Sequence, residues 1–208
     1  MTKTTELAEL REEAVSCRRC PIHEHATQTV FGEGAPGRLM LLGEQPGDVE
    51  DRAGRPFVGP AGLLLRELLD EVGIDEESVY LTNAVKHFKW RPVGKRRIHD
   101  SPNASEIRAC AHWLDLELAV VSPELVVCLG ATAAQALFGR SARVGALRGR
   151  PHPLSPRTRA LVTIHPAVVL RAGERRAELR AGLLADLTLT AELLEGVEHR
   201  QTAETTKS

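Results

Sequence analysis

Several segments of the sequence carry side chains that can perform chemistry on a bound substrate. They supply carboxylates, amides and imidazoles, the groups that serve as general acids, general bases and nucleophiles in enzymes. In chain order they are Glu44, Gln45 and Asp48 of "GEQPGD", Asn83 of "LTNAV", His99 of "GKRRIH" and His165 of "TIHP". These residue types predict a catalytic site that is built from loops far apart in the sequence.

A second group of residues is suited to metal binding. Cys17 and Cys20 form a C-x-x-C pair, which by itself is a weak signal for a metal or redox site. With Cys110 and His87 they would make a Cys3His set, which suits either structural zinc or an iron–sulfur cluster. An unliganded thiol pair is the alternative. Cys128 lies inside an apolar run and is expected to be a core residue.

The elements that must position these residues can be read from four short apolar runs. Each run has the length and composition of a buried parallel strand, and helical patterns separate the runs. Strands are expected at 38–43, 79–85, 124–130 and 160–165, and the main helices at 59–74, 103–121, 131–139 and 174–194. Strands that alternate with helices predict an α/β domain with a mostly parallel sheet.

The loops that follow the expected strands are the natural place for a site. In a parallel sheet, ligands bind where the carboxyl ends of the strands meet these loops. Here the loops read "GEQPGD", "NAVKHFKW", "GATAA" and "HPAVVLR", and three of the four carry chemically capable residues. The sequence therefore predicts a site at this edge of the sheet.

The size and charge of the chain limit what it can bind. Its 208 residues suit one domain, expected over 1–195, and the stretch 196–208 is expected to be a flexible tail. The formal net charge of −1 gives no general attraction to nucleic acid, so DNA binding would need a local basic patch. That patch is expected in a segment without acidic residues that holds Lys86, Lys89, Arg91, Lys95, Arg96 and Arg97.

The N-terminal segment and the apolar runs give no sign of export or of membrane insertion. The first 17 residues are amphipathic and include acidic residues, which argues against a secretory or transit peptide. No apolar run approaches the roughly 20 residues that a membrane span needs. We therefore expect a cytoplasmic protein whose cysteines are reduced or bound to metal.

Taken together, the motifs resemble those of the family 4 uracil-DNA glycosylases. The segments that carry the resemblance are "CRRCPIHEHATQTVFGEG", "LMLLGEQPGDVEDRAGRPFVGPAG", "YLTNAVKHFKW", "CLGATAA" and "TIHPAVVLR", in family order from about Cys17 to Leu187. Within the family, "GEQPG" and the inserted "GKRRIH" are similar to the UdgX subgroup. The resemblance implies a three-layer α/β/α sandwich, a [4Fe–4S] cluster and action on uracil in DNA. We expect the central, mostly parallel sheet of the sandwich to be four-stranded. We also expect a monomer that prefers single-stranded DNA.

The resemblance implies the ligands of the cluster. In the family four cysteines hold it, and the third follows Asn-x-x-Lys. That position is His87 here, as in the UdgX subgroup. The implied set is Cys17, Cys20, His87 and Cys110, with zinc as the alternative if the protein is made without cluster assembly.

The resemblance also implies the uracil-binding residues. Phe57 matches the family's stacking aromatic, and Asn83 can read the amide edge of uracil and reject the amino group of cytosine. His165 resembles the histidine that bonds uracil at O2, although Ala167 replaces the serine of the usual "HPS" motif. Gly43 would let the backbone approach the substrate closely, and Gln45 of the same loop is a further candidate for the pocket.

Cleavage of the glycosidic bond would leave a sugar cation, which Glu44 can stabilise. In ordinary family members water intercepts that cation, whereas in the UdgX subgroup the histidine that ends "KRRIH", here His99, bonds to C1′ of the sugar. Glu44 or Gln45 can set the tautomer of this histidine, and Asp48 lies on the same loop. The residues expected to contact DNA phosphates are Lys86, Lys89, Lys95, Arg96 and Arg97.

Two other functions stay open on the sequence. One is an ordinary turnover glycosylase that releases a free abasic site. The other is a non-catalytic iron–sulfur protein that binds DNA through the basic patch. The presence of Glu44, Asn83, His99 and His165 together favours an enzyme over this second alternative.

Overall fold

The structure, a computed structural model, describes the backbone of residues 1–205 and the side chains of residues 1–196. Its centre is a six-stranded sheet in the order β1-β3-β2-β6-β8-β7, in which the four middle strands are parallel. These four strands are those expected from the sequence. They are β2 (Leu39–Gly43), β3 (Val79–Asn83), β6 (Leu125–Leu129) and β8 (Arg159–Thr163).

The edges of the sheet correct the expectation of four strands. β1 (Glu33–Gly34) pairs with β3, and β7 (His152–Pro153) pairs with β8, both in antiparallel fashion. Each edge strand has only two residues, so neither leaves the apolar run by which a strand is recognised in a sequence. The sheet is therefore mixed, with a parallel centre.

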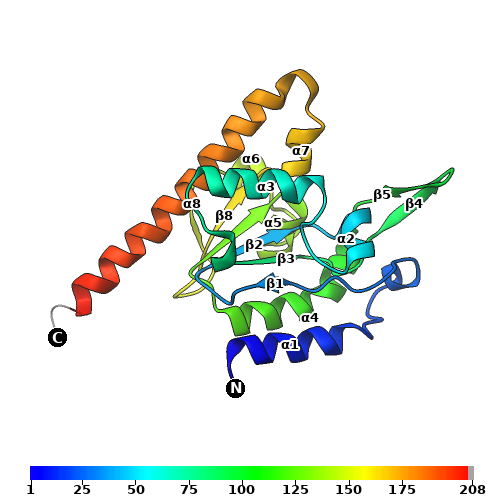
Figure 1. Cartoon of the computed structure of the whole chain (residues 1–208), viewed down its shortest axis with the longest axis horizontal. Helices are drawn as coiled ribbons and strands as arrows, with labels where there is room; N and C mark the ends of the chain where they lie inside the picture. The colour runs from blue at the N-terminus through cyan, green and yellow to red at the C-terminus, as the bar shows by residue number, and fades with distance from the viewer. Residues whose placement is uncertain (206–208) are drawn as a thin grey trace.

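Helices cover both faces of the sheet and complete the predicted three-layer sandwich (Figure 1). The helices of one face are α3 (Pro60–Glu71), α7 (Pro166–Leu170) and α8 (Arg176–Thr205). The helices of the other face are α1 (Lys3–Ala14), α4 (Ala104–Val121), α5 (Ala131–Phe138) and the short α6 (Val144–Leu147).

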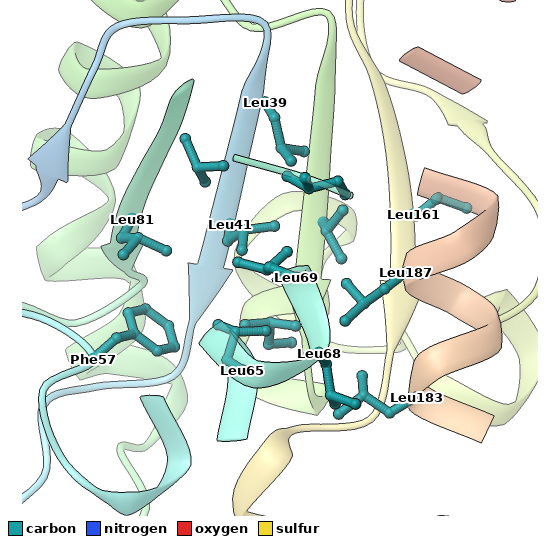
Figure 2. Close-up of a cluster of buried hydrophobic side chains, with 14 of the residues drawn as sticks. Leu39, Leu41, Phe57, Leu65, Leu68, Leu69, Leu81, Leu161, Leu183 and Leu187 are labelled. Atoms are coloured by element: carbon teal, nitrogen blue, oxygen red, sulfur yellow. The ribbon is translucent and has the colours of Figure 1, made fainter. Parts of the chain in front are cut away.

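The parallel strands bury alternate side chains against the two helical layers, as the period of a strand requires. Figure 2 shows one layer, where leucines such as Leu65 of α3 and Leu187 of α8 lie over Leu41 and Leu161 of the strands. Cys128 belongs to the opposite layer and is fully buried, so its assignment to the core is confirmed. The carboxyl ends of all four strands are thereby held at one rigid edge.

The basic segment at 91–100, which we expected to be a loop, is a β-hairpin that projects from the body of the protein (Figure 1). β4 (Trp90–Val93) pairs with β5 (Arg96–His99), and Trp90 lies opposite His99. Gly94 takes a φ of 59° at the turn, a value that favours glycine. His99 therefore lies at the base of the hairpin, at the end of a strand.

Helix α8 is longer than the sequence predicted. It was expected to end at 194, but its backbone is helical to Thr205, which includes most of the expected tail, while residues 206–208 lie outside the described part. Flexibility of this segment stays a prediction. Among the described residues, no helix is both long and apolar enough to cross a membrane.

Lys86 is fully buried behind the end of β3, which corrects its expected contact with DNA. Its Nζ forms an ion pair with Glu117 of α4 and donates to Thr82 Oγ1 (2.6 Å) and to Asn83 O (2.8 Å). Glu117 also accepts a hydrogen bond of 3.0 Å from the Tyr80 hydroxyl, and burial together with this carboxylate raises the pKa of Tyr80. This network ties the end of β3 to α4.

We expect Lys86→Met to lower the free energy of unfolding by about 3–5 kcal/mol, because the buried carboxylate of Glu117 loses its cation. Urea denaturation followed by circular dichroism measures the change. The double variant Lys86→Met with Glu117→Gln removes both charges and should recover a large part of the loss. A single variant as stable as the parent protein would contradict the assignment.

Candidate active site and metal site

A pocket of about 920 Å³ opens at the carboxyl ends of the parallel strands. Its wall is built from the loops that the sequence singled out, together with the base of the hairpin. The predicted residues that line it are Glu44, Gln45 and Asp48 after β2, Phe57 before α3, Asn83 at the end of β3, His99 at the end of β5 and His165 after β8. The structure thus brings these side chains together at the expected edge.

Phe57 and Asn83 meet beside Gly43, which fixes the shape of one wall of the pocket. A Cβ at Gly43 would lie 2.3 Å from Asn83 Oδ1 and 2.8 Å from Phe57 Cζ, so glycine is required there. Phe57 adopts a left-handed φ of 55°, and its carbonyl accepts a hydrogen bond from Arg66. A Cβ at Gly62 would lie 1.8 Å from that carbonyl oxygen, so this glycine, missed by the sequence reasoning, also positions Phe57.

His165 is the N-cap residue of α7, and its protonation follows from its contacts. Its Nδ1 accepts a hydrogen bond of 3.1 Å from the backbone N–H of Ala167, and burial lowers the pKa of His165 to about 4. The ring is therefore neutral near pH 7 and carries its proton on Nε2. Because the backbone of Ala167 makes this bond, the serine hydroxyl that is absent here is not needed for it.

Glu44 connects the hairpin to α5. Its Oε2 accepts a hydrogen bond of 2.7 Å from the Thr132 hydroxyl, and its Oε1 lies 3.3 Å from His99 Nε2, an ion-pair distance. Burial opposes ionisation, but the contacts with His99 and Thr132 outweigh it and lower the pKa of Glu44. The carboxylate is therefore ionised beside the imidazole. Thr132, in the "GATAA" segment, was not among the predicted residues.

Gln45 holds the base of the hairpin. Its Nε2 donates to Lys89 O and to Asp100 O, both at 3.1 Å, and its Oε1 accepts from Lys89 N at 3.1 Å. The amide is thus fully used on the backbone on either side of β4 and β5. Gln45 therefore acts on the position of His99 through the backbone, and since it also lines the pocket, its expected contact with uracil stays a prediction.

Arg97 fixes the hairpin to α2 (Asp48–Ala53), which corrects its expected contact with phosphate. Its guanidinium bonds the carboxylates of Asp48 and Asp51, the latter at 2.6 Å, and packs against the rings of Phe88 and Trp90. Asp48 is engaged in this ion pair and also lines the pocket, so it positions the hairpin and its expected catalytic role stays a prediction. The carboxylates of the "GEQPGD" loop thus help to orient His99.

The remaining basic residues of the hairpin divide into two kinds. Lys89 is directed inward and forms an ion pair of 3.0 Å with Glu106, so it too is not free for phosphate. Lys95 and Arg96 at the tip are exposed, and their expected contact with DNA stays a prediction. The basic patch of the sequence therefore reduces, on the surface, to Lys95, Arg96 and Arg91.

The predicted cysteine ligands lie in one region between α1 and α4. Cys20 and Cys110 are buried in the same apolar cluster, and Cys17 packs against it. Cys110 Sγ accepts a hydrogen bond of 3.2 Å from Lys86 N, and Cys17 Sγ accepts one of 3.1 Å from Trp113 Nε1. Burial raises the pKa of the Cys110 thiol to about 11, and the neighbouring Cys20 and Cys17 act in the same direction.

His87 presents an unused ring nitrogen in the same region. The Thr29 hydroxyl donates to Ala14 O at 2.9 Å, so it must accept the hydrogen bond of 2.9 Å from His87 Nε2. His87 Nδ1 is buried and has no hydrogen-bond partner among the described residues, and burial lowers the pKa of His87 to about 4. A neutral ring with a free lone pair on Nδ1 fits a metal ligand whose orientation Thr29 fixes.

The donor set fits the implied cluster in its chemistry. Three thiols and one imidazole are ligands that iron–sulfur clusters accept. Among the described residues no three histidine, cysteine or acidic side chains are gathered so that they could hold a single metal ion. In a cubane cluster each ligand binds a different iron atom, so its ligands stand further apart than those of zinc.

Comparison with known protein sequences identifies the class of protein to which this fold and pocket belong. Residues 31–188 match the uracil DNA glycosylase superfamily, and the chain belongs to that superfamily. It is 40% identical to a type-4 uracil-DNA glycosylase of Thermotoga maritima over 185 residues, which cover 88% of this chain and 92% of the relative. It is 36% identical to a type-4 enzyme of Pyrobaculum aerophilum (86% and 91% covered) and 32% identical to a type-5 uracil-DNA glycosylase of Thermus thermophilus (90% of each).

The depressed pKa of His165 makes the stability of the protein depend on pH. Between pH 6.5, where a histidine in the unfolded chain titrates, and about pH 4, the unfolded state binds a proton that folded His165 does not. Stability therefore falls as the pH falls through this window. We expect the melting temperature to drop from pH 7 to pH 4, and to drop less in His165→Gln. Equal slopes in the two proteins would contradict the buried neutral ring.

Proposed function

We propose that the protein is a uracil-DNA glycosylase of the UdgX type, which excises uracil from DNA and becomes bonded through His99 to C1′ of the remaining sugar. The observation that carries the proposal is the position of His99. Its imidazole lines the same pocket as Asn83, Phe57 and His165, and lies 3.3 Å from the ionised carboxylate of Glu44. Family membership supports the glycosylase part of the proposal.

The pocket supplies what recognition of a flipped uracil requires. Such enzymes take the base out of the stack, stack it on an apolar or aromatic side chain and read its edge with hydrogen bonds. Phe57 offers the ring, and the Asn83 amide, 4% exposed and fixed beside Gly43, can donate to O4 and accept from N3–H of uracil. Cytosine presents an amino group and an unprotonated N3 at the same places, so the amide would reject it.

Cleavage breaks the bond between N1 of uracil and C1′, and uracil leaves with the electron pair. The neutral His165 can donate its Nε2–H to O2 of the departing uracil anion, where negative charge develops. The Glu44 carboxylate faces the positive charge that develops on the sugar. Both groups are preorganised by contacts with the protein, through Ala167 N–H and the Thr132 hydroxyl.

His99 then competes with water for C1′. A neutral imidazole is a competent nucleophile, and its lone pair forms the new bond to carbon. The bond forms from the ring nitrogen that carries no proton, so the ring becomes cationic. Glu44 stabilises that charge until the proton on the other ring nitrogen passes to water. Gln45 and Arg97 raise the chance of this capture because they hold the hairpin base in place.

The test is incubation with a single-stranded oligonucleotide that contains one uracil, followed by a denaturing gel. We expect a protein–DNA band that survives heat and detergent. His99→Ser should abolish the band and leave excision with turnover, because water fills the vacated space. His112→Ser, a matched change at an exposed histidine of α4, should leave the band intact. Gln45→Ala should keep excision and slow the formation of the band.

Each other outcome of this gel points to a different function. Free protein beside an abasic product would mean an ordinary turnover glycosylase. Complete retention of uracil after long incubation would mean a protein that binds DNA without cleaving it. An inert His99→Ser would contradict the assignment of His99 as the group that competes with water.

We propose that Cys17, Cys20, His87 and Cys110 hold a [4Fe–4S] cluster, with zinc as the less favoured occupant. The orphaned Nδ1 of His87 and the grouped thiols support this set. The cluster would stabilise the fold and take no part in the cleavage. It would join the N-terminal segment to α4, close to the hairpin, since the indole N–H of Trp90 donates to His25 O at 2.9 Å.

A brown protein with broad absorbance near 400 nm and bound iron is the expected result of anaerobic purification. Cys110→Ser should lose colour and iron, because a ligand is removed. Cys128→Ala changes a cysteine outside the set and should keep both. Bound zinc without iron in the parent protein would overturn the proposal of a cluster.

We further propose that the substrate is uracil-containing DNA, preferably single-stranded, and that the protein acts as a monomer in the cytoplasm. Unpaired DNA favours flipping because no base pair must be broken. Reduced cysteines suit the cytoplasm.

A further inference from the structure

The charge of the chain is distributed very unevenly along the sequence. Residues 125–173 contain seven arginines and no aspartate or glutamate. Because the whole chain carries −1, the rest of it carries −8 against the +7 of this segment. The net charge close to zero is therefore the sum of a strongly basic segment, separate from the basic patch at 86–97, and an acidic remainder.

This arginine-rich segment forms one wall of the pocket. It runs from β6 through α5, α6 and β8 to the residues after α7, and contributes Gly130, Val144, His165 and Arg171 to the lining. In the sheet, β3 lies on one side of β2, and β6 followed by β8 lies on its other side. The hairpin that follows β3 and the arginine-rich segment therefore border the pocket from opposite sides.

The arginines of the segment differ in how they are used. Arg148 forms an ion pair of 2.6 Å with Asp186, and Arg159 donates to Leu193 O, so both serve the fold. Arg143 and Arg171 are exposed, and no carboxylate of the described residues forms an ion pair with either. Within the part of the chain that the structure describes, Arg143 bonds only the carbonyls of its own turn, at 3.0 Å, and it directly precedes Val144 of the pocket wall.

We infer that Arg143 and Arg171 bind phosphates of the DNA strand on the side of the pocket opposite the hairpin tip. The inference rests on the proposed function, because it requires a nucleic-acid strand to cross the pocket mouth. A guanidinium binds phosphate through paired, charge-assisted hydrogen bonds. With Lys86, Lys89 and Arg97 occupied inside the protein, the hairpin alone offers little positive charge to this polyanion.

The test measures binding of a fluorescent single-stranded oligonucleotide without uracil, by anisotropy over a series of salt concentrations. Each lost phosphate contact should lower the slope of log K against log salt by about 0.7 and weaken binding about threefold at low salt. Arg143→Gln and Arg171→Gln should each show this change. Arg171→Lys, which keeps the charge, should retain the slope.

Arg157→Gln is the matched control. Arg157 is exposed and belongs to the same acid-free segment, but it lies in the loop that enters β8, at the amino-terminal edge of the sheet. It should bind DNA like the parent protein. Equal weakening in all three glutamine variants would show a diffuse effect of net charge and overturn the inference, as would unchanged binding of Arg143→Gln and Arg171→Gln.

The binding assay is independent of the reaction. If the parent protein leaves uracil in DNA but shows the predicted pattern of binding, the phosphate-binding role of Arg143 and Arg171 is supported and the proposed function is contradicted. If it excises uracil without that pattern, the proposed function is supported and the phosphate-binding role is contradicted. Melting temperatures of the variants identify any that are misfolded.

Discussion

The pairing of β2 with β3 is the constraint on which the site depends. Their parallel register sets Gly43 beside Asn83, and the backbone bonds continue past the strands, from Ala84 N to Gly43 O and from Val85 N to Glu44 O. This fixes the amide that would read the base and the carboxylate that would face the sugar on one rigid frame. The buried pair of Lys86 and Glu117 then ties that frame to α4.

The hairpin stands outside the central sheet, and its position is set by side chains that reach it from other parts of the protein. Gln45 holds its base, Arg97 joins it to α2, and Trp90 connects it to the segment after Cys20. Its tip, with Lys95 and Arg96, is exposed. A projecting element is thereby held in the fixed geometry that the proposed reaction would need.

Apolar runs and the loops that follow them predicted the four parallel strands and a site at their carboxyl ends. The three layers and the roles of Phe57 and His165 were implied by the resemblance to a known family. The sequence could not show which basic side chains of the segment 86–97 turn inward. In the sequence, Lys86 and Arg97 cannot be told apart from an exposed residue such as Lys95, because it is their tertiary contacts with Glu117 and Asp51 that turn them inward. Two-residue edge strands leave no pattern. The acid-free stretch at 125–173 was visible in the sequence, but its place beside the pocket required the fold.

The hydrogen bonds by which the Gln45 amide holds the base of the hairpin differ in one respect from the ion pairs of Arg97. An amide has no ionisable proton, so its three bonds to the hairpin backbone are the same in acid and in base, and ions in solution do not screen them as they screen the Arg97 pair. The backbone on either side of β4 and β5, and with it the position of His99, is therefore held in part by contacts that do not depend on the charge of any group.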